Sequence, residues 1–274
     1  MCGRFHRFDD VQKMATQFRA KYDESLFAPP TYNAPPQTRQ PVIRLDQDGE
    51  REIVNMRWGL VPYWSKDDKT AFSTFNARAE TILSSNTFRN AMRKRRCLVP
   101  VNGFYEWQKR EKGVKQPYAI GMKDGSSFAF AGLWETWIET QQVIERRLDL
   151  AAERARRLEE RRLEDLGDAL FPLTPEEHSR EAEADPDADP TPRTLLTFTI
   201  ITCDPNELTQ EFHDRMPVIL DPKDYDRWLE PGDPQQPPID LLRPYPAELM
   251  RAWKIGPDVG NVRNNRPGLI DPIE

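Results

Sequence analysis

The sequence is poor in the residues that build cross-linked or metal-holding proteins. Three cysteines and three histidines are spread over 274 residues. An odd, small number of cysteines in a chain of this length argues against a disulfide scaffold and favours a reducing compartment. Cysteine and histidine also show no metal-ligand spacing. We therefore expect neither disulfides nor a metal or other cofactor.

Long apolar runs are equally scarce. No stretch approaches the roughly 20 apolar residues that a membrane helix needs. Charged Arg4 and Arg7 near the start are followed by no apolar core of the signal-peptide kind. These absences predict a soluble protein that has no membrane partner.

Negative charge is unevenly distributed along the chain. The net charge of −6 at first opposes nucleic-acid binding. Residues 139–193, however, hold 16 acidic and 9 basic residues, whereas the rest of the chain holds 29 acidic and 30 basic ones. The acidity thus belongs to one segment, and the remaining chain is free to form a local basic groove.

The same segment differs in pattern from its surroundings. Within 142–166, apolar residues recur every three or four positions among charges, which predicts a long amphipathic helix. Residues 174–193 are rich in Ala, Glu, Asp and Pro, a composition typical of disorder. We interpret 139–193 as an acidic helical and disordered insertion within a single domain that spans 1–274. We expect it to project away from a DNA groove or to act as a regulatory flap.

The remaining chain alternates between short apolar runs and turn residues, which predicts an α+β fold. Runs rich in β-branched and aromatic residues predict strands, and apolar residues at helical spacing predict a few short helices. The expected strands cover 42–45, 53–60, 97–101, 103–107, 115–122, 127–134, 195–203 and 218–220, and the expected helices cover 8–22, 86–96 and 222–230.

Three aromatic residues surround a glycine and a proline in Trp58-Gly59-Leu60-Val61-Pro62-Tyr63-Trp64. This composition is typical either of a buried hydrophobic corner or of a rigid, partly exposed aromatic wall. Nucleic-acid bases stack on such walls with about 1–3 kcal/mol each. The sequence alone leaves both alternatives open.

Polar residues at three further places could carry chemistry. Asn76 and Arg78 share a face if the chain is extended there, and an arginine fork suits a phosphate. Glu106 alternates with apolar neighbours, so it is either a charge on an edge strand or a carboxyl group in an apolar pocket. In the second case burial would raise its pKa toward that of a general acid or base. His213 lies at a helix-to-strand junction beside Asp214.

The start of the chain offers the most distinctive chemistry. If Met1 is removed, Cys2 becomes a terminal aminothiol, with an amine and a thiol on adjacent carbons. The amine, with a pKa of about 8, is substantially neutral near pH 7. It can condense with an aldehyde to an imine, and the thiol can then close a five-membered thiazolidine ring. Taken alone, Cys2 is better explained as an ordinary small residue after the start codon.

Taken together and in their order along the chain, the motifs resemble those of the SOS response-associated peptidase family, also called abasic-site processing proteins. The resemblance covers the chain apart from roughly 139–193. The matching motifs are Met1-Cys2-Gly3-Arg4-Phe5, Tyr32-Asn33, Trp58-Gly59-Leu60-Val61-Pro62, Asn76-Ala77-Arg78-Ala79-Glu80-Thr81, Phe104-Tyr105-Glu106-Trp107, His213-Asp214-Arg215-Met216-Pro217 and Val259-Gly260-Asn261-Val262.

The resemblance implies a mostly antiparallel, barrel-like β core with peripheral helices. It implies that Cys2, freed of Met1, attacks the ring-opened aldehyde of an abasic site in single-stranded DNA. The resulting thiazolidine crosslink would shield the lesion during replication. The protein would be a monomer in the cytoplasm, associated with the nucleoid, or in the nucleus of a eukaryotic cell.

The resemblance also assigns roles to single residues. Asn76 would orient the Cys2 amine or the opened sugar. Glu106 would be the general acid and base of imine chemistry, and His213 would protonate the sugar oxygen. The positions expected to contact DNA are Arg4, Arg78, Trp64, Trp107, Asn33 and Thr202.

Three alternatives to this reaction remain open at the level of sequence. Cys2 with Glu106 and His213 could form an N-terminal-nucleophile peptidase whose minimal act is the removal of Met1. The aromatic and arginine residues could instead form a non-catalytic single-strand DNA binder. A short-lived imine followed by strand scission would make the protein a lyase that uses the same residues.

Overall fold

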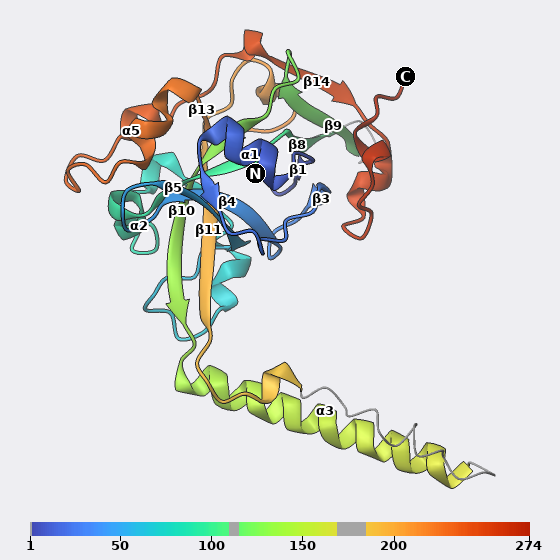
Figure 1. Cartoon of the computed structure of the whole chain (residues 1–274). Helices are drawn as coiled ribbons and strands as arrows, with labels where there is room; N and C mark the ends of the chain where they lie inside the picture. Colours follow the sequence, from blue (N-terminus) through green and yellow to red (C-terminus); the bar gives the residue numbers. More distant parts are fainter. Residues whose placement is uncertain (1, 110–114, 169–184) are drawn as a thin grey trace. The chain divides into compact units, whose positions relative to one another are not determined.

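The computed structural model describes residues 2–109, 115–168 and 185–274 (Figure 1). The chain forms two compact units, one made of Met1–Trp137 with Leu195–Glu274 and the other of Ile138–Thr194. The second unit brackets the segment that the sequence predicts to be an insertion. No helix in the described ranges combines the length and the apolar character that crossing a membrane requires.

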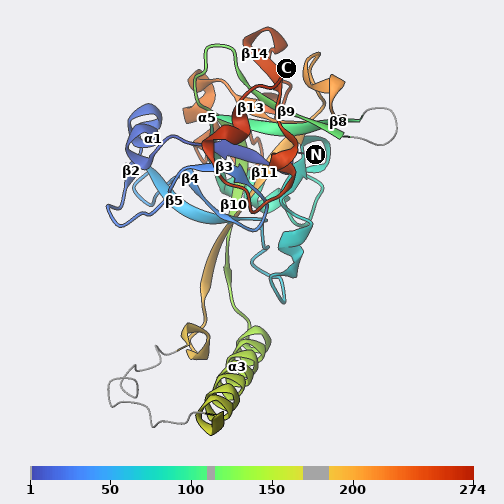
Figure 2. The same cartoon turned by 90° about the vertical axis from the view of Figure 1, so that its right-hand side faces the viewer.

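The first unit is built on a closed ring of five strands. Figure 2 labels β4, β5, β10 and β11 of this ring. Strands β11, β10, β7, β4 and β5 follow one another, and β11 returns to pair with β5. The β4–β5, β4–β7 and β7–β10 pairs are antiparallel, whereas the closing β5–β11 pair is parallel. The prediction of a mostly antiparallel, barrel-like core in an α+β fold is therefore confirmed. The ring strands are β4 (Arg39–Leu45), β5 (Arg51–Trp58), β7 (Arg96–Val101), β10 (Phe128–Ile138) and β11 (Thr194–Cys203).

Four short strands extend the same sheet. Two of them pair with β11 near the site described below: β6 runs parallel to it and β12 antiparallel. The other two pair with β5 and β10. The short strands are β2 (Lys21–Tyr22), β6 (Asn76–Arg78), β12 (Met216–Pro217) and β13 (Ile219–Leu220).

A second sheet of five strands has the order β14-β9-β8-β1-β3, and its four strand pairs are antiparallel. The first strand of the chain thus lies inside a sheet rather than at its edge, which holds the start of the chain in place. The strands are β1 (Phe5–Arg7), β3 (Thr31–Ala34), β8 (Gly103–Lys109), β9 (Lys115–Met122) and β14 (Met250–Lys254).

Aromatic side chains join this sheet to the barrel. The ring of Phe5 lies 5.0 Å from that of Trp58 and 6.4 Å from that of Phe130. Phe104 packs on the same Phe130 ring at 5.8 Å. Adjacent to Phe104, Gly103 allows close packing, since a Cβ atom there would come within 2.5 Å of the His6 ring. The two sheets therefore share one core.

Short helices accompany the sheets of the first unit. Helix α1 begins after Asp10, whose side chain accepts a hydrogen bond from the Lys13 amide, and ends at Arg19 in the left-handed conformation. It is therefore shorter than the predicted 8–22. The helices are α1 (Val11–Phe18), α2 (Arg89–Lys94) and α5 (Tyr225–Leu229), and 3-10 turns supply the other helical segments.

The second unit contains the long helix α3 (Gln141–Asp168), which agrees with the helix expected over 142–166. The Arg147 guanidinium donates hydrogen bonds to the carbonyls of Asp187, Asp189 and Thr191 and pairs with Glu139. These contacts hold 185–193 against α3. Disorder within the insertion stays a prediction. Residues 174–184 of the predicted disordered stretch lie outside the described residues.

Candidate active site

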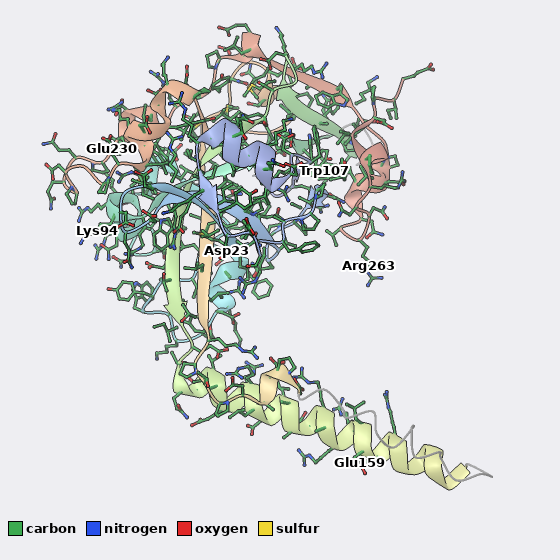
Figure 3. All side chains as sticks on the ribbon, in the orientation of Figure 1. Asp23, Lys94, Trp107, Glu159, Glu230 and Arg263 are labelled. Carbon is green, nitrogen blue, oxygen red and sulfur yellow. The ribbon has the colours of Figure 1, made fainter. Side chains whose placement is uncertain are left out.

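A cavity of about 1020 Å³ brings together four residues that the sequence singles out: Arg78, Glu106, Trp107 and His213. They come from β6, from two consecutive positions of β8, and from the turn before β12. Trp107 is labelled in Figure 3. The full lining consists of Arg78, Glu106, Trp107, Lys115, Gln210, Glu211, Phe212, His213, Asp214, Arg215 and Gly260.

Cys2 is fully buried and bound to Asn76. The Asn76 side-chain amide donates a 2.8 Å hydrogen bond to the Cys2 carbonyl, while its Oδ1 is buried without a partner among the described residues. The thiol lies 3.9 Å from the Arg4 carbonyl. Burial raises the pKa of the Cys2 thiol, and the Glu106 carboxylate raises it further. The thiol is therefore protonated at neutral pH.

Glu106 lies on an interior strand rather than at a sheet edge, because β8 lies between β9 and β1. Its side chain is 4% exposed, and its Oε1 has no hydrogen-bond partner in the described part of the chain. Burial raises the pKa of Glu106 to about 7, with a smaller contribution from the Asp214 carboxylate. A carboxyl group with this pKa can both take up and release a proton near neutrality.

His213 is held by its neighbours. Its Nδ1 lies 3.0 Å from the Arg215 backbone nitrogen and 2.7 Å from an Asp214 carboxylate oxygen. The Arg215 guanidinium forks onto both carboxylate oxygens of Glu80 and donates to the Thr202 carbonyl at 2.6 Å. Sequence reasoning assigned no role to Asp214, Arg215 or Glu80. The sequence could have indicated them, because Asp214 and Arg215 belong to the same motif as His213, and Glu80 belongs to the same motif as Asn76.

Arg4 is fixed at one side of the site. Its Nη1 donates to Asn33 Oδ1 at 2.7 Å and to the Val259 carbonyl at 2.9 Å, and its guanidinium lies over the Trp107 ring at 5.9 Å. The Asn33 amide nitrogen in turn donates to the carbonyls of Val259, Asn261 and Asn264. The buried Asn33 thus ties Arg4 to the segment that carries Gly260 of the cavity wall.

Two other predicted DNA contacts lie apart from the cavity lining. Thr202 is fully buried, and its hydroxyl donates to the Ala77 carbonyl at 3.4 Å. Trp64 is 52% exposed and lies next to exposed Tyr63, whereas Trp58 is buried in the core. The aromatic segment therefore combines both readings of its sequence, a buried corner at Trp58 and an exposed pair at its end. The catalytic and DNA-binding roles of all the predicted site residues, Thr202 and Trp64 included, stay predictions.

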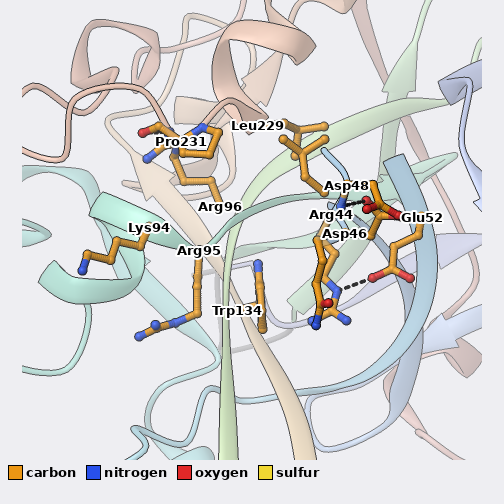
Figure 4. Close-up of a pocket in the computed structure, with 12 residues that line it drawn as sticks. Arg44, Asp46, Asp48, Glu52, Lys94, Arg95, Arg96, Trp134, Leu229 and Pro231 are labelled. Atoms are coloured by element: carbon orange, nitrogen blue, oxygen red, sulfur yellow. Dashed lines mark hydrogen bonds and ion pairs between the residues drawn. The ribbon is translucent and has the colours of Figure 1, made fainter. Parts of the chain in front are cut away.

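A separate cavity of about 740 Å³ is lined by residues of β4, β5, α2, β7 and β10 and of the loops that follow β4 and α5 (Figure 4). Arg44 stacks on Trp134 at 4.4 Å and pairs with Glu52 at 2.8 Å. Arg95, which also lines this cavity, pairs with Glu135 at 2.6 Å. The predicted site residues do not line this cavity, so the one around Glu106 is the candidate active site.

Comparison with known proteins gives a consistent result. A family model described as SOS response associated peptidase (SRAP) matches residues 1–158 and 176–262. Abasic site processing protein YoqW of Bacillus subtilis is 32% identical over 278 residues, with 99% of each chain covered. Abasic site processing protein HMCES of Gallus gallus is 34% identical over 264 residues, which cover 89% of this chain and 67% of that protein. A crystal structure of a Bacteroides thetaiotaomicron protein has the same fold, with a TM-score of 0.73 at 24% identity over all of both chains.

Proposed function

The chain belongs to the SOS response-associated peptidase family, and we propose that it processes abasic sites by a covalent crosslink. Cys2, freed by removal of Met1, would join a ring-opened abasic site in single-stranded DNA through a thiazolidine. The names of YoqW and HMCES, both abasic site processing proteins, support this substrate. The crosslink would protect the lesion during replication.

The observation that carries the proposal is a pair of buried acceptors beside Cys2. Asn76 Oδ1 and Glu106 Oε1 have no partners among the residues described. A buried acceptor without a donor costs about 1–3 kcal/mol, so such groups are rare in folded proteins. The amine that Cys2 gains on removal of Met1 is a donor that could satisfy both.

The proposed reaction balances without a co-reactant. The Cys2 amine adds to the aldehyde carbon, and loss of one water leaves an imine. The thiol sulfur then bonds to the imine carbon, and the thiol proton ends on the nitrogen. Glu106, with its pKa near 7, takes the proton from the attacking amine and returns one to the departing hydroxyl.

The other residues would prepare the strand and the sugar. His213 would protonate the ring oxygen as the sugar opens, and Asn76 would orient the amine. Arg4 and Arg78 would contact phosphates. Bases would stack on Trp107 and Trp64. Asn33 and Thr202 would complete the DNA-binding positions. We propose that the protein acts as a monomer, in the cytoplasm or in a nucleus.

The test is a denaturing gel of the protein with an oligonucleotide that bears one abasic site. Mass spectrometry first confirms that Met1 is absent. We expect a heat-stable shifted band that disappears in Cys2→Ala and persists in Cys203→Ala, which removes another buried thiol. A single-stranded oligonucleotide should react faster than the same site in a duplex.

A peptidase is the second candidate, because the family name and the N-terminal cysteine allow it. That role would need the buried thiol of Cys2 to attack a peptide carbonyl directly, whereas in the crosslink the Cys2 amine attacks first. Absence of a band from folded protein that lacks Met1 would overturn the crosslink proposal. Cleavage of an unrelated peptide would then favour the peptidase. Salt-sensitive binding that Cys2→Ala does not change would indicate a non-covalent DNA binder, and a cut strand would indicate a lyase.

A further inference from the structure

The Nδ1 atom of His213 lies close to two groups that favour opposite protonation states of that nitrogen. The Arg215 amide, 3.0 Å away, donates a hydrogen bond and therefore needs a lone pair on Nδ1. The Asp214 carboxylate, 2.7 Å away, only accepts and therefore needs a proton on Nδ1. Nδ1 cannot satisfy both at once. The amide thus favours the neutral ring with its proton on Nε2, and the carboxylate favours the doubly protonated ring.

Charged side chains from several elements line the cavity around the His213 ring. The ionisable side chains that line the same cavity from neighbouring elements are Arg78 on β6, Glu106 on β8, Lys115 on β9, Glu211 in the 209–211 turn and Arg215 before β12. Arg215 is already paired with Glu80 through two hydrogen bonds. An Asp214 carboxylate oxygen lies at ion-pair distance from His213 Nδ1, and Asp214 also acts electrostatically on Glu106.

We propose that Asp214 is a positioning residue of the active site, which holds His213 in its protonated form with Nδ1–H directed at the carboxylate. This inference rests on the proposed function. The protonated ring can give its Nε2 proton to the ring oxygen of the closed sugar. The bond from that oxygen to the anomeric carbon then breaks, and Glu106 takes the hydroxyl proton as the aldehyde forms. The Nδ1 proton stays on His213 throughout and remains hydrogen-bonded to the Asp214 carboxylate.

The contact can be tested without any reaction, by an NMR titration of the histidine ring protons. The chain has three histidines, and the signal of His213 is the one that disappears in His213→Gln. We expect Asp214→Asn to lower the His213 titration midpoint by about 0.5 to 1 pH unit, since an exposed carboxylate stabilises a neighbouring cation moderately. Glu207→Gln removes the same charge from an exposed position outside the cavity, and it should leave the midpoint in place. An unchanged midpoint in Asp214→Asn would overturn the proposal.

The second measurement is the rate of crosslink formation between pH 5 and 9. Without the Asp214 charge, His213 loses its proton at lower pH and Glu106 ionises at lower pH. Both limbs of the bell-shaped profile should therefore move to lower pH in Asp214→Asn, while the Glu207→Gln profile superimposes on that of the wild type. An Asp214→Asn profile that also superimposes would overturn the proposal. If the wild type formed no crosslink at any pH, the proposed function would fail, and the NMR titration would still decide whether Asp214 holds His213.

Discussion

At the scale of single residues, the Glu106 carboxyl group links stability to reactivity. Its pKa in the folded protein is about 7, against 4.5 as its ordinary value. Between these pH values the folded state binds more protons than the unfolded state. The free energy of unfolding therefore falls as the pH rises from about 4.5 to 7. Glu106 therefore contributes least to the stability of the fold above pH 7, where its carboxylate is ionised and can accept a proton.

Replacing Glu106 by Gln should remove this dependence. Gln has a similar shape and stays neutral, so the stability of Glu106→Gln relative to the wild type should rise by up to about 3 kcal/mol between pH 4.5 and pH 8. Crosslinking should fall by on the order of 10² at the same time, because the acid–base group is lost. Urea unfolding at both pH values measures the first effect. Glu207→Gln is the control, because it should differ from the wild type in free energy of unfolding by the same amount at both pH values. If the Glu106→Gln difference were equally independent of pH, the prediction would be contradicted.

At the scale of elements, β1 carries the start of the chain into the interior of a sheet. Its neighbour Arg4 is bound by Asn33 of β3, and Asn33 also holds three carbonyls of the segment 259–264. The two ends of the chain therefore meet at one asparagine. The geometry of the cavity wall depends on this link, because Gly260 belongs to the held segment.

Asn33→Asp tests the link with little change in shape. A carboxylate oxygen would replace the donor that faces three carbonyls, and we expect a loss of about 2–4 kcal/mol of stability. Hydrogen exchange should accelerate at the amides of Asn261 and Asn264, which close the turns of this segment. Asn55→Asp is the matched control, since the Asn55 amide donates a single hydrogen bond at an exposed position. Equal losses of stability in the two variants would argue that Asn33 does not fix the segment 259–264.

The elements also show what local sequence could predict. The barrel strands were predicted within a few residues, because β-branched and aromatic runs are local signals, as in Thr194–Cys203. The strands Phe5–Arg7 and Thr31–Ala34 were missed, because each is short and depends on partners far away in the chain. Helix α2 is shorter than the predicted 86–96, because β7 already begins at Arg96.

The site shows the same division. Alternation along β8 placed Glu106 beside an apolar neighbour, but it could not tell an edge from a buried strand, which only the pairing of β8 with β1 and β9 decides. The contacts of Asp214 and Glu80 depend on where β12 and the turn after β6 meet in space. No local pattern contains that information.

At the scale of the whole molecule, the chain carries a charged second unit between two adjacent barrel strands. β10 and β11 are hydrogen-bonded neighbours, and the amide of Glu139 donates to the Arg193 carbonyl at 3.0 Å. The two ends of the unit therefore lie close together. A short turn could connect them directly.

Deletion of 139–193, with a four-residue Gly-rich turn in its place, should leave crosslinking unchanged. Closing a loop of about 4 residues instead of 55 costs less entropy, so the deletion protein should be more stable by up to about 2 kcal/mol. Urea unfolding and the gel assay measure the two effects. Loss of crosslinking in a folded deletion protein would refute the expectation that the insertion is dispensable for the reaction.

The parallel pair that closes the barrel also sets the order in which the protein can mature. Arg57 of β5 pairs with Thr197 of β11, 140 positions later. A ribosome therefore has to release most of the chain before the ring can close, and such long-range pairing slows folding. Cys2 leaves the ribosome first, whereas His213 and Gly260 follow near the end. The cavity that His213 and Gly260 help to line is therefore completed only when synthesis is nearly finished.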